Sequence, residues 1–175
     1  MERLHVTRRA FLVGAALGGL ARGARAGTPP SHPPLFVIAR SKNANVVRYD
    51  ARLVRPGRLD PSEPIRAYWI LRAEDGRHEE LTFLERKLAY GWSAWFDPEG
   101  ALRLRLKAFE QRDIRVVCSE KAGFRAVTRI ARRPAVLERI YVASEEHALL
   151  PSVRYVDVFG TTLAGGERLT ERIVP

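Results

Sequence analysis

A strict alternation of apolar and basic side chains over residues 102–109, LRLRLKAF, constrains the fold of this chain more than any other feature. Successive strand residues point to opposite faces of a sheet, so this pattern is typical of a half-buried strand. Residues 124–131, FRAVTRIA, repeat the alternation more weakly. The chain is therefore expected to be rich in β-structure, with 102–109 as one strand.

Short apolar runs elsewhere supply the other expected strands. They cover residues 35–39, 45–50, 65–71, 114–118, 136–143, 153–159 and 169–174. Turn-forming sequences separate several of them, among them AEDGR at 73–77 and DPEG at 97–100. Many short strands joined by turns predict an antiparallel β-sandwich or barrel-like domain of about eight or nine strands.

A single helix is expected within this domain, at about residues 82–90. Thr82 and Glu85 have the spacing of a capping box, in which each side chain bonds the backbone N–H of the other residue. Leu84 and Leu88 lie four residues apart on one helical face. Gly91 is expected to end the helix in the left-handed conformation. The mostly β domain thus contains one short inserted helix.

Residues 1–26 have the features of a signal peptide. Arg8 and Arg9 precede an uncharged run, residues 10–21, and a small-x-small cleavage site ends at Ala26. The run is too short to span a bilayer, which needs about 20 apolar residues. The paired arginines resemble a twin-arginine export signal, and an ordinary secretory signal is the alternative. Cleavage near Ala26 would make the protein periplasmic or extracellular.

The remaining chain divides into a linker and one domain. Residues 27–34, GTPPSHPP, form a proline-rich linker, and residues 35–175 form a single β-rich domain. Removal of five Arg and one Glu with the signal lowers the formal net charge from +10 to +6. A basic exported protein favours an anionic envelope component or a glycan as partner, and makes nucleic acid an unexpected one. We expect no transmembrane span in the mature protein.

The stretch RSKNANVVRYDA, residues 40–51, places polar residues between two expected strands. Asn favours tight turns, so a hairpin connection is one interpretation. The other is that Lys42, Asn43 and Asn45 present hydrogen-bond donors at an open end of the domain, where ligands bind in such folds. Tyr90 and Trp92, at the end of the expected helix and just beyond it, would complete this candidate ligand site.

A second candidate is a basic sheet face that would contact an anionic surface. It comprises Arg103, Arg105, Lys107, Arg125 and Arg129. Its alternative is an ordinary solvated strand face. The single cysteine, Cys118, lies in the apolar run IRVVCS and is expected to be a small buried hydrophobe.

No pattern for catalysis or for a cofactor emerges. Glu145, Glu146 and His147 lie together, yet no second histidine has metal-ligand spacing, so no metal is expected. The sequence contains no phosphate-binding glycine loop and no nucleophile elbow. No catalytic residue is therefore assigned, and whether the protein is an enzyme is left open, with a negative answer favoured.

Three segments together resemble a known family. They are RSKNANVVRYDA, PIRAYWIL at 64–71 and LTFLERKLAYG at 81–91, and the later VDVFGTTLAGGERLTERI at 156–173 is similar to that family's C-terminal end. The family is the exported bacterial domain-of-unknown-function family 4833. The resemblance implies one secreted domain and transfers no activity. We expect a non-catalytic binding or structural module of the cell envelope, with an envelope hydrolase acting on glycan or lipid as the alternative.

Overall fold

The computed structural model describes residues 34–41, 43–119, 123–145 and 152–175. The expected signal peptide lies outside these residues, as does the linker apart from Pro34. Within them the chain forms thirteen strands, one α-helix and one short 3-10 helix, η1. The prediction of a mostly β domain with one short helix is confirmed.

The elements follow one another in this order. They are β1 (Pro34–Arg40), β2 (Asn43–Ala51), β3 (Leu53–Arg55), β4 (Arg58–Leu59), β5 (Ile65–Leu71), η1 (Arg72–Glu74), β6 (Arg77–Glu80), α1 (Phe83–Leu88), β7 (Trp92–Phe96), β8 (Leu102–Leu106), β9 (Phe109–Ser119), β10 (Gly123–Ile130), β11 (Arg133–Glu145), β12 (Ser152–Thr162) and β13 (Arg168–Ile173). The additional strands relative to the prediction are β3, β4, β6 and β7, which are all short.

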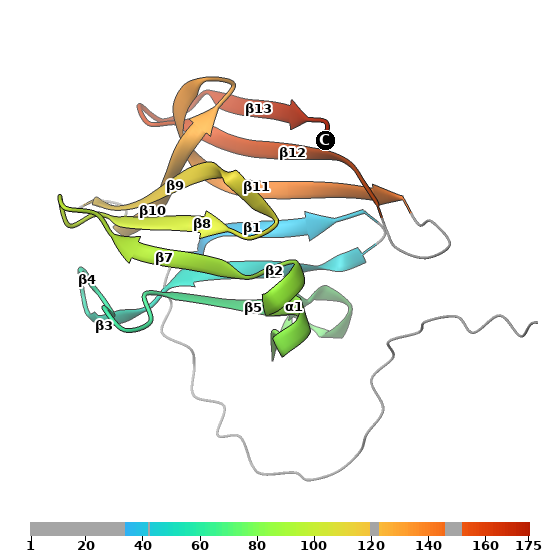
Figure 1. The fold of residues 1–175 in the computed structure, drawn as a ribbon, viewed down its shortest axis with the longest axis horizontal. Coiled ribbons are helices and arrows are strands. Elements are labelled where there is room, and N and C mark those ends of the chain that lie inside the picture. Colours follow the sequence, from blue (N-terminus) through green and yellow to red (C-terminus); the bar gives the residue numbers. More distant parts are fainter. Residues whose placement is uncertain (1–33, 42, 120–122, 146–151) are drawn as a thin grey trace, which may run out of the picture. The chain divides into compact units, whose positions relative to one another are not determined.

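Three other strands pair with the long strand β11. Its first residues pair with β10, its later residues pair with β1 in parallel, and β12 pairs along most of its length. The main sheet runs in the order β6-β5-β2-β1-β11-β10-β9-β8-β7, and β12 and β13 extend from β11. Figure 1 shows this sheet curling, so that β7 returns towards β5 and α1. The sheet thus has two arms, β1-β2-β5-β6 on one side of β11 and β10-β9-β8-β7 on the other, and they enclose the core.

A close backbone crossing accompanies the change of partner along β11. The register between β11 and β12 shifts between Leu137 and Arg139, and Gly160 lies opposite Leu137. A Cβ atom at Gly160 would lie 2.1 Å from the carbonyl oxygen of Val136 and 2.7 Å from Cδ1 of Ile130. Only glycine fits there without movement of the backbone.

The core is formed by the inward residues of both arms. Phe36 on β1 stacks on Tyr49 on β2, with ring centroids 4.6 Å apart, and both are fully buried. The three leucines of the alternating run, Leu102, Leu104 and Leu106, are buried as the pattern predicted. The period-two signal therefore identified the inward face correctly.

The prediction of one strand over residues 102–109 was wrong. The strand ends at Leu106, and Phe109 begins β9 and pairs back with Leu106. Lys107 and Ala108 form the turn, where the N–H of Lys107 donates to the oxygen of Gly91, 2.9 Å away. Alternation alone cannot reveal this, because a two-residue turn preserves the phase of the pattern.

The helix begins with the expected capping box. The N–H of Glu85 donates to Oγ1 of Thr82 (3.3 Å), and the N–H of Thr82 donates to Oε2 of Glu85 (2.8 Å). The helix ends at Leu88, slightly earlier than predicted. Gly91 does not adopt the left-handed conformation, so that prediction was wrong. It is glycine because a Cβ atom would lie 1.8 Å from the oxygen of Arg86.

Candidate functional site

A pocket of about 550 Å³ lies where β1 ends, beside the turn between β8 and β9. This volume is within the range of small-molecule sites. Its wall is mostly apolar and draws on β1, β8, β9, β11, β12, β13, the turn between β8 and β9, and the segment after α1. The lining residues are Ile38, Arg40, Ala89, Tyr90, Leu106, Lys107, Ala108, Phe109, Glu110, Gln111, Ile140, Val142, Val153, Val156, Ile173 and Pro175.

Arg40 is the basic residue set into the apolar wall. It continues the inward face of β1 that begins with the buried Phe36 and Ile38. Its guanidinium carbon lies 4.8 Å from the centroid of the Tyr90 ring. Its Nε atom is buried and has no hydrogen-bond partner, and Arg40 forms no salt bridge within the described part of the chain. The cation is therefore held by an aromatic face without a carboxylate partner.

Tyr90 is fixed from two sides. Its backbone oxygen accepts a 2.8 Å hydrogen bond from the hydroxyl of Tyr49. The ring of Trp69 packs edge-on against the ring of Tyr90, with centroids 5.1 Å apart. Burial disfavours the phenolate and raises the pKa of Tyr90 to about 12, although the positive charge of Arg40 opposes that rise. The phenol is therefore neutral at physiological pH, and its ring is a firm platform for the guanidinium.

Two further charges line the pocket beside the β8–β9 turn. Lys107 and Glu110 are both exposed, with Gln111 next to them. Together with Arg40, these side chains give the pocket a formal charge of +1. The charge balance suits a single negative charge better than a dianion.

Among the described residues that were predicted for the first candidate site, only Tyr90 lines this pocket. Asn43 and Asn45 lie at the start of strand β2, where the N–H of Asn45 donates to Oδ1 of Asn43 over 2.9 Å. Oδ1 of Asn45 is buried without a partner. Trp92 packs edge-on against Tyr49 at 5.9 Å and borders the core. Lys42 lies outside the described residues.

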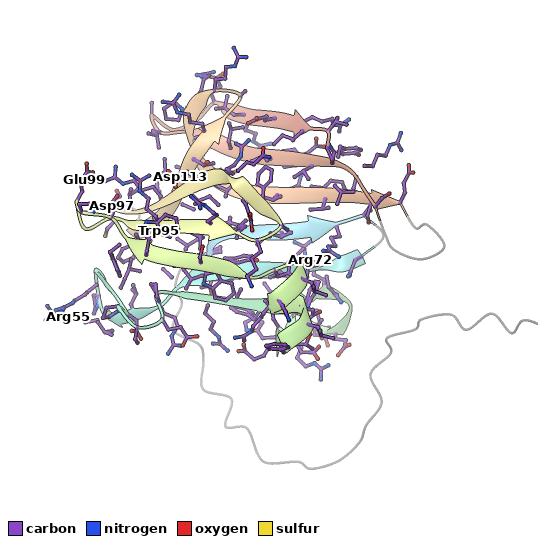
Figure 2. The ribbon with its side chains drawn as sticks, in the orientation of Figure 1. Arg55, Arg72, Trp95, Asp97, Glu99 and Asp113 are labelled. Atoms are coloured by element: carbon purple, nitrogen blue, oxygen red, sulfur yellow. The ribbon has the colours of Figure 1, made fainter. Side chains whose placement is uncertain are left out.

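The structure divides the predicted basic face. Arg103 bonds Asp97 at 2.9 Å and Asp113 at 2.6 Å, and Arg105 lies 5.3 Å from the centroid of the Trp95 ring. Lys107 contributes to the pocket instead. Figure 2 shows Asp97, Glu99 and Asp113 gathered near this part of the sheet.

Arg125 and Arg129 are exposed on β10, and neither forms a salt bridge among the described residues. Strand β9 separates them from Arg103 and Arg105 on β8. On the β8 part of this face, Arg103 is paired with carboxylates. The five predicted side chains therefore do not form an unbroken cationic stripe.

Cys118 is exposed, which corrects the expectation of a buried thiol. It follows Ile114 and Val116 in phase, but it lies near the end of β9, beyond the core, and lines a second, more open groove with Phe124.

Glu146 and His147, which lie together in the sequence with Glu145, are outside the described residues. The residues that are described contain no cluster of three or more His, Cys, Asp or Glu side chains.

Arg40 is the site residue that sequence reasoning missed. It opens the stretch RSKNANVVRYDA, in which the sequence predicted a connection between two strands. The available signal was the phase of the preceding strand, because Phe36, Ile38 and Arg40 recur at every second position. A basic residue in phase with a buried apolar face is unusual enough to mark a site.

The fold and the pocket define a curled, largely antiparallel β-domain with a mainly apolar pocket and one basic side chain in its wall. The chain belongs to the family described as domain of unknown function (DUF4833), whose model matches residues 36–172. No curated protein and no solved structure matches the chain. None of the helices in the described ranges is long and apolar enough to span a bilayer.

Proposed function

We propose that this protein is a non-catalytic binding module of the cell envelope whose ligand is a small amphiphile with an apolar body and one negatively charged head. The observation that carries this proposal is Arg40, a cation in an apolar wall whose Nε has no partner. A buried N–H without an acceptor costs about 1–3 kcal/mol. An anion bound to the guanidinium would offset much of the cost of keeping this charge in the pocket.

The pocket wall specifies the rest of the ligand. Aliphatic and aromatic side chains from six strands surround the space, including Ile38, Phe109, Ile140 and Ile173. Removing apolar surface from water contributes about 25 cal/mol per Å², so an alkyl or fused-ring body would bind better than a sugar. The anionic ligands considered above thus narrow to a lipid-like acid, with a carboxylate as the simplest head.

The chemistry of the lining residues supports binding over hydrolysis. Hydrolysis of an ester or glycoside needs a nucleophile or an acid–base pair within hydrogen-bond reach of the substrate. Among the described lining residues, Glu110 is the one carboxylate side chain, and none is a Ser, Cys, His or Asp. We therefore favour a binding module over an envelope hydrolase.

Export is part of this proposal. Arg8 and Arg9 before an uncharged run support the twin-arginine route, with cleavage near Ala26 and a periplasmic or extracellular product. Replacement of both arginines by lysine should block export. Fractionation of the cells that make the protein would show where the product lies. Unchanged export would contradict the twin-arginine route and point to the general secretory route.

Calorimetric titration with dodecanoate tests the binding site. We expect Arg40→Gln to weaken binding by about tenfold or more, because a hydrogen bond to a charged group contributes about 1.5–3 kcal/mol. The matched control is Arg125→Gln, which removes an exposed arginine outside the pocket and should leave binding unchanged. Dodecyltrimethylammonium, which has the same chain and the opposite charge, should bind far more weakly.

Two results would overturn the proposed site. Equal binding of dodecanoate by the wild type and the Arg40→Gln variant would show that Arg40 does not hold the head. Failure of the wild type to bind dodecanoate, together with failure to bind alkyl phosphates and alkyl sulfates, would remove the amphiphile proposal altogether.

A further inference from the structure

Helix α1 exposes its apolar side chains. Phe83 is 75% exposed, Leu84 64% and Leu88 70%, and the helix has no buried residue. A surface helix usually turns its apolar face towards the core. Here the helix is held by the buried residues on either side of it, Leu81 and Tyr90, and by a hydrogen bond of 3.0 Å from Nε1 of Trp69 to Oε1 of Glu85. The apolar residues of α1 are therefore free to contact something outside the domain.

The size of this apolar face argues against a second copy of the chain as its partner. Three side chains of this size offer roughly 300–400 Å². A stable protein interface buries about 800 Å² on each partner and needs a complementary shape. A lipid bilayer makes no such demand, because its headgroup region accepts isolated apolar side chains from a short helix lying in the interface.

The charges on α1 fit an anionic bilayer. Lys87 forms no salt bridge within the described residues, and its Nζ atom lies 5.9 Å from the ring centroid of Phe83. Arg86 shares the carboxylate of Glu80 with Arg66. A basic residue beside exposed apolar side chains is the usual composition of a helix that binds anionic lipid surfaces.

The helix is also continuous with the pocket. Ala89 and Tyr90, which follow α1 directly, line the pocket and support Arg40. This step rests on the proposed function, since an amphiphile pocket gains from contact with the membrane that contains its ligand. The exposure of Phe83, Leu84 and Leu88 is an independent observation.

We propose that α1 docks this domain on an anionic lipid bilayer, with Phe83, Leu84 and Leu88 entering the boundary between headgroups and acyl chains and Lys87 contacting the lipid phosphates. The helix keeps its fold on docking, because the capping box that starts it is already formed. Docking brings the segment that carries Tyr90 to the membrane surface.

Sedimentation with vesicles tests the proposal. The probes are vesicles of phosphatidylcholine alone and of phosphatidylcholine mixed with phosphatidylglycerol. The combined variant Phe83→Ser, Leu84→Ser and Leu88→Ser should bind the mixed vesicles at least about tenfold more weakly, because apolar burial provides most of the affinity. Lys87→Gln should weaken binding about fivefold, and only to the mixed vesicles.

The matched control replaces two exposed apolar residues elsewhere. Val54→Ser combined with Leu163→Ser changes side chains that are 56% and 53% exposed, and vesicle binding should not change. All the replaced side chains are exposed, so thermal unfolding should show intact domains.

Three outcomes would overturn membrane docking. The triple serine variant could bind vesicles as the wild type does, or the wild type could fail to bind either kind of vesicle. Alternatively, sedimentation velocity could show a wild-type dimer that the triple variant abolishes, which would make this face a contact between copies. Dodecanoate titration without vesicles separates the two proposals, since the triple variant should retain that binding and Arg40→Gln should retain vesicle binding.

Discussion

The guanidinium carbon of Arg40 lies 4.8 Å from the ring centroid of Tyr90, at the point where the end of β1 meets the segment that follows α1. The contact holds a positive charge in an otherwise apolar wall. A cation over an aromatic face gains about 0.5–2 kcal/mol, which does not replace a hydrogen-bonded carboxylate. The arrangement is therefore more suited to binding an anion than to stabilising the fold.

The unpaired Nε of Arg40 should cost the folded protein stability. Arg40→Met should raise the free energy of unfolding by about 1 kcal/mol, because it removes a buried N–H without a partner from an apolar wall. Chemical denaturation checks it, and Arg125→Met on the exposed face of β10 should change stability by less than about 0.5 kcal/mol. A marked loss of stability in Arg40→Met would show that the arginine is structural.

Glu85 should be important for stability because both of its carboxylate oxygens are used. One accepts from Nε1 of Trp69 and the other from the N–H of Thr82. Glu85→Ala should lower the free energy of unfolding by about 1–3 kcal/mol. The control is Glu79→Ala, at an exposed position of β6, and equal effects of the two changes would contradict the structural role of Glu85.

The turn between β10 and β11 carries avoidable strain. Ala131 and Arg132 both have positive φ, at 50° and 66°. Such a two-residue hairpin favours Asn-Gly, so Ala131→Asn with Arg132→Gly should stabilise the protein by about 1–2 kcal/mol. The reverse control is Gly165→Ala, where φ is 80°, and this change should destabilise the protein. Thermal unfolding of both variants measures the difference.

The raised pKa of Tyr90 leads us to expect a loss of stability in alkali. Its pKa is raised to about 12, whereas an unfolded tyrosine ionises near pH 10. The contribution of the neutral phenol to the free energy of unfolding is therefore complete below about pH 10. It declines as the pH rises towards 12, by up to about 1 kcal/mol at pH 11. Tyr90→Phe should reduce this decline by that amount, as measured by urea unfolding at each pH. Parallel curves for the two proteins would refute the prediction.

Cys118 should react in the folded protein. Its side chain is exposed in the groove between β9 and the β3–β4 hairpin region. One thiol per chain should be modified by a disulfide reagent without denaturant, and Cys118→Ser should abolish the signal. A reaction that needs unfolding would show that the thiol is covered.

The sequence alone determined the local features. Alternation at 102–106 identified the inward leucines because the strand period is independent of the partner strand. The capping box at Thr82 and Glu85 followed from a spacing of three residues, and the structure contains both of its hydrogen bonds. The hydrogen bond between the backbone N–H of Asn45 and the side chain of Asn43 is equally local.

The tertiary structure decided where the pocket lies and which residues line it. Strand β1 pairs in parallel with β11, so Arg40 lies opposite Val142, about a hundred residues away. Such pairings depend on which buried faces fit together across the whole sheet, and no short sequence pattern encodes them. The same reason explains Cys118 and Lys107. Their residue types and phases were readable from the sequence, whereas their surroundings were set by strands that are distant along the chain.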